Sequence, residues 1–192
     1  MTGSRALLWT ALVLLLTAGC SYSINGDALS EAGGASSAAT PTSTGSAGAP
    51  KIAKPRTVVD VEPCTLLDAD DLKSIGPYKK DPARKDDVIQ ESCQYVLDDG
   101  SQGGRTVVVA LYQKYEQVRS RQAKGREVVV DGHSTWVLCE LSGGETACTA
   151  TLAVNANRSV LVAMAQPGGV PDQMLAAMQP LLKAALNRLP VA

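Results

Sequence analysis

Two β-rich arms flank a Gly143-Gly144 pair, and each arm carries one cysteine. Gly-Gly is a favoured two-residue hairpin loop, because glycine adopts positive φ without steric cost. With this loop, Cys139 lies opposite Cys148 in a non-hydrogen-bonded pair, where Cα atoms approach to about 4.5 Å. That spacing is at the short end of the range that a disulfide spans. The segment STWVLCELSGGETACTATLAV therefore predicts an antiparallel hairpin closed by a Cys139–Cys148 disulfide.

Two further cysteines, Cys64 and Cys93, are left to form a second disulfide by elimination. An even number of cysteines in an exported domain is typical of a disulfide framework. The competing interpretation is a four-cysteine metal site, but the spacings contain no C-x₂-C signature. The sequence thus predicts two disulfides and no metal, and titration of free thiols would distinguish the two interpretations.

The first 20 residues have the pattern of an export signal. Arg5 is the only charged residue among the first 26, and a run of eleven residues from 6 to 16 is apolar except for one threonine. The run is too short to span a bilayer, which takes about 20 apolar residues, but it fits the apolar region of a signal peptide. The small residues at 17–19 lead directly into Cys20. This arrangement resembles the bacterial lipobox, in which the cysteine thiol takes a diacylglycerol.

We therefore expect a signal peptide over residues 1–19 and a lipid attachment site at Cys20. A diacylglycerol, with a further acyl group such as palmitate, supplies the two or more chains that stable anchoring requires. The expected location is the extracytoplasmic face of the cell membrane, with the lipid on Cys20 as the anchor and no other cofactor. The alternative is a secreted protein in which Cys20 is a chance residue.

Residues 20–56 are predicted to form the lipidated end of the chain and a flexible Ser/Gly/Ala/Thr/Pro-rich tether. Between Gly33 and Pro50 there is no charged residue and no large apolar one. Such a segment cannot bury enough apolar surface to offset its ordering entropy. The globular domain is expected over residues 57–192.

The charge and the aromatic content of the chain exclude one class of partner. The formal net charge is −1, there is no Phe, and only 4% of residues are aromatic. The protein therefore lacks both the basic surface that binds nucleic-acid phosphates and the aromatic platforms on which single strands stack. No nucleic-acid partner is expected.

Hydrophobic periodicity indicates helices at both ends of the domain. Asp68 is a candidate N-cap for a first helix that ends before Gly76-Pro77. The last segment, residues 171–189, has the apolar stripe of an amphipathic helix, which Pro180 should kink or split.

Between these helices the pattern alternates between strands and one further helix. Residues 77–87 have the composition of a solvated loop of mixed charge, and a helix with a basic outer face is expected within residues 112–125. The element order α-β-β-α-β-β-β-α predicts a single α+β domain. We expect an antiparallel sheet of about five strands with helices packed on one face.

No catalytic constellation is found in the sequence. His133, the only histidine, falls in a predicted turn, and the neighbouring Ser134 would point to the opposite face of a strand. No G-x-S-x-G elbow is present, and no glycine-rich phosphate loop precedes a helix. The acidic cluster Asp68, Asp70 and Asp71 is explained by a helix N-terminus, where carboxylates are favourable. We therefore expect neither an enzyme nor catalytic residues.

Three short motifs stand out: PCTLL at the first helix, ESCQY before a strand, and LNRLP at the end of the last helix. Together they resemble the motifs of DUF3558, a family of actinobacterial lipoproteins of unknown function. The resemblance covers residues 57–190. It implies an exported, membrane-anchored, disulfide-stabilised protein of uncharacterised activity, and it supplies no catalytic residues.

Two kinds of function agree with these features. The first is a binding module for a ligand, lipid, glycan or protein of the cell envelope, which predicts an apolar crevice or an exposed patch. The alternative is a structural or regulatory accessory that docks to a membrane complex, which predicts a closed core without a small-molecule pocket.

Overall fold

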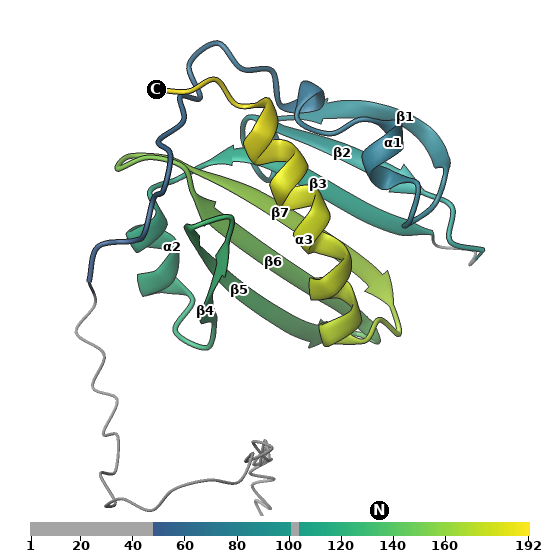
Figure 1. The fold of residues 1–192 in the computed structure, drawn as a ribbon. Helices are drawn as coiled ribbons and strands as arrows, with labels where there is room; N and C mark the ends of the chain where they lie inside the picture. Colours follow the sequence, from purple (N-terminus) through teal and green to yellow (C-terminus); the bar gives the residue numbers. More distant parts are fainter. Residues whose placement is uncertain (1–47, 101–103) are drawn as a thin grey trace, which may run out of the picture. The chain divides into compact units, whose positions relative to one another are not determined.

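The computed structural model describes residues 48–100 and 104–192, which form one seven-stranded antiparallel sheet with three α-helices (Figure 1). The strands lie in the order β1-β2-β3-β7-β6-β5-β4. The predicted signal peptide, Cys20 and the tether as far as residue 47 fall outside the described residues. Along the chain the elements are the 3₁₀-helix η1 (Pro63–Thr65), α1 (Ala69–Leu72), β1 (Tyr78–Lys85), β2 (Ser92–Leu97), β3 (Arg105–Tyr112), α2 (Tyr115–Arg121), β4 (Arg126–Val130), β5 (His133–Ser142), β6 (Glu145–Ala153), β7 (Ser159–Pro167) and α3 (Pro171–Arg188).

The α+β class is as predicted, but the expected count of about five strands is wrong. β1 lies within residues 77–87, which the sequence analysis assigned to a solvated loop. None of its residues is buried, and its sequence YKKDPARK has no alternation of apolar and polar positions. Lysines, a proline and register irregularities are common on edge strands, because they discourage pairing with another sheet. The features that protect this edge therefore also hide the strand from pattern analysis.

The Gly-Gly hairpin has the register expected from its loop length. Cys139 pairs with Cys148 across β5 and β6, and both loop glycines have positive φ. The described residues form two disulfides: Cys139–Cys148 within this hairpin, with a Cα separation of 4.0 Å, and Cys64–Cys93, with a Cα separation of 4.9 Å. The second disulfide attaches η1 to β2.

The main hydrophobic core lies between one face of the sheet and α3, with η1 and α1 at the β1–β3 end (Figure 1). Alternate residues of the central strands point to this face, as the two-residue period of a strand requires. The apolar stripe predicted for α3 supplies the opposite wall. Its buried residues are Met174, Met178, Leu181, Leu182, Ala185 and Leu186.

Of the two expected effects of Pro180, a kink or a split, the split is wrong, because α3 continues through this residue. Proline cannot donate a hydrogen bond to the carbonyl four residues earlier, here that of Ala176. Both Pro180 and Ala176 are exposed, so solvent can reach this carbonyl, while the buried stripe holds the helix on either side. Within the described ranges, no helix is both long enough and apolar enough to cross a bilayer.

α2 packs on the opposite face of the sheet, which corrects the expectation that the helices share one face. Val137 belongs to the α3 core, so its neighbour Trp136 points away from α3. Trp136 Nε1 donates to the carbonyl of Gln122, the C-cap of α2, at 3.1 Å. Tyr115 and Val118 of α2 are buried outside the main cluster, against this second face.

Residues 51–56, which the sequence analysis assigned to the tether, are hydrogen-bonded to the domain. The N–H of Arg56 donates to the carbonyl of Val154 at 2.8 Å, and the side-chain amide of Asn155 donates to the carbonyl of Arg56 at 2.8 Å. Arg56 also pairs with Val191 near the C-terminus. The ordered domain therefore begins before residue 57.

Candidate functional site

His133 is the first residue of β5 and is buried, so its predicted position in a turn is wrong. The turn is limited to Asp131 and Gly132, which both have positive φ, and the strand resumes at once. His133 Nδ1 lies 2.7 Å from the carbonyl oxygen of Ala153, and the N–H of Lys54 donates to Nε2 at 3.4 Å. Both ring nitrogens have backbone partners, so the role that this geometry supports is structural: His133 joins the 51–56 segment to the end of β6.

Ser134 points to the opposite face from His133, as expected for neighbours on a strand. Its hydroxyl donates to Glu127 Oε1 at 2.6 Å and accepts from the N–H of Lys51 at 2.9 Å. With both partners supplied by the fold, Ser134 has no arrangement that would activate it as a nucleophile.

The acidic cluster forms the N-terminus of α1, as the sequence indicates. Asp68 accepts from the N–H groups of Asp70 and Asp71, and the side chain of Asp71 accepts from the N–H of Asp68, which completes a capping box. The bond from the Asp71 N–H and the nearby Arg188 guanidinium lower the pKa of Asp68. The described residues contain no group of three or more His, Cys, Asp or Glu side chains placed to hold a metal ion.

The crevice between α3 and the sheet is filled by the core side chains and leaves no ligand-sized cavity. Two spaces lie between α3 and the sheet: one of about 230 Å³ beside Arg105 and Met174, and one of about 80 Å³ beside Val128 and Leu175. Small-molecule sites have volumes of about 300–1,000 Å³. Both spaces between α3 and the sheet in the described part of the chain are smaller than this range.

A ligand-sized hollow lies beside loop 86–91, the connection from β1 to β2. Asp86 closes this loop: its Oδ1 accepts from the N–H of Glu91 at 3.0 Å, and its Oδ2 accepts from Arg84 Nε at 3.1 Å. These two bonds lower the pKa of Asp86. The loop presents Val88 almost fully to solvent, at 89% exposure.

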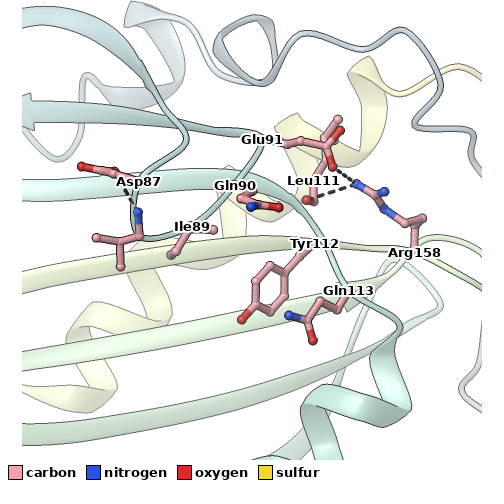
Figure 2. A pocket seen from close by; sticks show the side chains of 9 residues that line it. Asp87, Ile89, Gln90, Glu91, Leu111, Tyr112, Gln113 and Arg158 are labelled. Atoms are coloured by element: carbon pink, nitrogen blue, oxygen red, sulfur yellow. Dashed lines mark hydrogen bonds and ion pairs between the residues drawn. The ribbon is translucent and has the colours of Figure 1, made fainter.

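Glu91 and Arg158 join the loop to the neighbouring strands β3 and β7 at the same end of the sheet. Glu91 has a positive φ of 50°, which is uncommon for a residue with a side chain. Its carboxylate forms an ion pair with Arg158, which directly precedes β7, and Arg158 Nη2 also donates to the carbonyl of Leu111 at 3.3 Å. The pair is drawn in Figure 2. These contacts hold the loop beside the ends of β3 and β7.

The space beside these residues, which we call the Arg158 hollow, has a volume of about 390 Å³. Figure 2 shows the Tyr112 ring and the Gln90 and Gln113 amides around it. Gln113 Oε1 accepts from Arg121 Nη1 at 2.7 Å, so its amide NH₂ remains a donor. The lining residues are Asp87, Val88, Ile89, Gln90, Glu91, Leu111, Tyr112, Gln113 and Arg158.

The chemistry of the Arg158 hollow is polar and almost neutral. The lining contains two carboxylates, Asp87 and Glu91, and one guanidinium, Arg158, which gives a formal charge of −1. A second hollow of about 360 Å³ lies beside the same loop, with Val88 and Ile89 in both walls. Loop 86–91 is thus exposed beside two concave surfaces, which makes it the best-formed candidate for a binding element in the described structure.

Sequence reasoning missed this site. Its residues come from the β1–β2 loop, the end of β3 and the start of β7, and only the fold brings them together. The single local signal is Asp86, because aspartate commonly closes turns by accepting bonds from nearby backbone N–H groups.

A family profile described as "Protein of unknown function (DUF3558)" matches residues 15–180 of the chain. The matched range includes both disulfides, loop 86–91 and Arg158. No curated protein matches the chain.

Proposed function

Because the chain belongs to the DUF3558 family, whose function is unknown, we propose a function from its own residues. The protein is a lipid-anchored binding module on the extracytoplasmic face of the cell membrane, and its Arg158 hollow holds a neutral saccharide of the cell envelope. The observation that carries this proposal is a ligand-sized polar hollow on a domain whose core is otherwise closed.

The export half of the proposal is supported by the cysteines. Two disulfides persist in oxidising compartments and are rare in the cytosol. Cys20 ends the apolar run and is the one cysteine outside these disulfides. A thiol at this position is the group that a lipoprotein signal requires.

The ligand class follows from what the hollow offers and what it would repel. Two carboxylates disfavour an anion, and a lining rich in amide, carboxylate and guanidinium groups disfavours an acyl chain. Planar polar side chains can bond the hydroxyls of a sugar, and the half-buried Tyr112 ring offers a flat surface for its C–H groups.

Replacing Cys20 with alanine is expected to move the protein from the membrane fraction to the soluble or secreted fraction, because the anchor is lost. The control is Ser21→Ala, which keeps the thiol and should remain in the membrane. Mass spectrometry of the N-terminal peptide should show a diacylglycerol on Cys20 of the wild type. An unmodified, unprocessed N-terminus would contradict the proposed location.

Binding to the Arg158 hollow is tested with neutral oligosaccharides released from the envelope of the cells that produce the protein. A ligand at a hundredfold excess over its Kd stabilises a folded protein by about 2.7 kcal/mol, so the melting temperature should rise measurably. Gln90→Ala and Tyr112→Ala should weaken this rise, whereas Gln117→Ala, an exposed glutamine on α2, should not. The absence of any shift, or an equal shift in all variants, would contradict the saccharide site.

A further inference from the structure

The two edges of the sheet differ in a way that points to an interaction surface. The β1 edge carries three lysines, a proline and two register irregularities. The β4 edge has the sequence REVVV, an uninterrupted register against β5 and no proline. Edge strands that must stay unpaired usually carry the β1 type of protection. β4 has few of these protective features, and the side chain of its Val129 is 53% exposed.

The register shows which backbone groups of β4 face outward. The two-residue turn makes Val130 and His133 a hydrogen-bonded pair, and this pattern alternates along an antiparallel ladder. The N–H and C=O groups of Glu127 and Val129 therefore point away from β5. No hydrogen bond from outside the sheet reaches the backbone of either residue within the described structure.

We propose that β4 pairs antiparallel with β4 of a second copy of this chain, with the two Val128 residues facing each other across the symmetry axis. The outward groups of Glu127 and Val129 would then form four hydrogen bonds with the same residues of the second copy. The result is an isologous dimer with one sheet continuous across both copies.

Charge selects this register among the three that align the outward groups. Centring the pair on Glu127 would place two glutamates directly opposite each other, and centring it on Val129 would place Glu127 opposite Asp131. Like charges directly opposite are destabilising. Centring on Val128 places Glu127 opposite Val129 and avoids both arrangements.

The ends of β4 are also complementary in the antiparallel orientation. Lys124 and Arg126 lie at its start, and Asp131, whose carboxylate also forms an ion pair with Lys183 at 3.1 Å, follows its end. Antiparallel pairing brings the basic start of one strand beside the acidic end of the other, twice in each dimer. This favours a second copy of the same strand over an arbitrary extended segment.

Cysteine substitution tests the register in the full-length protein purified in detergent. Val128→Cys should give an intermolecular disulfide on mild oxidation, because facing Cα atoms of a non-hydrogen-bonded pair lie about 4.5 Å apart. Val129→Cys is the matched control. Val129 is more exposed than Val128, but in the proposed register it faces Glu127 of the second copy. The Val129 of the second copy is offset by two positions along the strand, so the two Val129 residues do not face each other. We expect the linked dimer for Val128→Cys and only background for Val129→Cys.

The mass in solution of the wild type and of one further variant tests the dimer without an introduced cysteine. Sedimentation of the wild type should give twice the protomer mass. Val129→Pro, which removes an outward N–H, should give the protomer mass with little change in melting temperature. A wild type that is monomeric, or equal cross-linking of both cysteine variants, would overturn the proposal. It would leave the saccharide site untouched, because β4 contributes nothing to the Arg158 hollow.

Discussion

Replacing Cys64 and Cys93 together with alanine is expected to lower the free energy of unfolding by about 3.5 kcal/mol, on a chain-entropy estimate for a closed loop of this length. The disulfide attaches η1 to β2 across 29 positions of the sequence, and Cys93 is fully buried. Without it, the unfolded chain gains the freedom of that loop. The start of the domain is then held to β2 by non-covalent contacts alone.

The measurement is equilibrium unfolding in urea, followed by circular dichroism. The matched control is the Cys139→Ala, Cys148→Ala double variant, which opens a loop of only nine positions between strands that are already paired. The same chain-entropy estimate gives a loss of about 2.7 kcal/mol in the free energy of unfolding for this control. If the hairpin variant were the less stable of the two, loop length would not be the property that ranks these disulfides.

Tyr95→Ala should lower the free energy of unfolding by about 3–5 kcal/mol, the range for removing a large buried aromatic side chain. Tyr95 has no exposed surface in the described structure, and its hydroxyl donates to the carbonyl of Leu67 at 3.2 Å. Burial raises the pKa of this hydroxyl. The side chain therefore fills the space between β2 and the η1–α1 segment, and alanine would leave a cavity there.

Tyr95→Phe separates the ring from its hydroxyl. The ring should account for most of the loss, so the phenylalanine variant should cost only about 1 kcal/mol, the usual net value of one hydrogen bond. Both variants are measured by urea unfolding, as for the disulfides. Equal losses for alanine and phenylalanine would show that the hydroxyl, and not the packing of the ring, determines stability at this position.

The parts of the fold that could be predicted from the sequence depend on neighbours along the chain. Gly143-Gly144 sets the β5–β6 register through its loop length, and that register places Cys139 opposite Cys148. The stripe of α3 is visible because one face of a helix repeats at a fixed spacing.

The parts that could not be predicted depend on contacts between distant segments. β1 has no apolar alternation, because an exposed edge strand needs none. His133 is buried because residues 51–56 return to cover it, which no local pattern indicates. The Arg158 hollow is of the same kind: the Glu91–Arg158 pair joins positions 67 residues apart, and only the finished sheet places them together.

Chemical-shift mapping by NMR, with a neutral envelope oligosaccharide added to the ¹⁵N-labelled mature protein, decides whether the Arg158 hollow binds a saccharide. We expect saturable shifts confined to the amides of loop 86–91, residues 111–113 and Arg158, the segments that surround the hollow. Shifts that map elsewhere on the sheet, or none at saturating oligosaccharide, would contradict it.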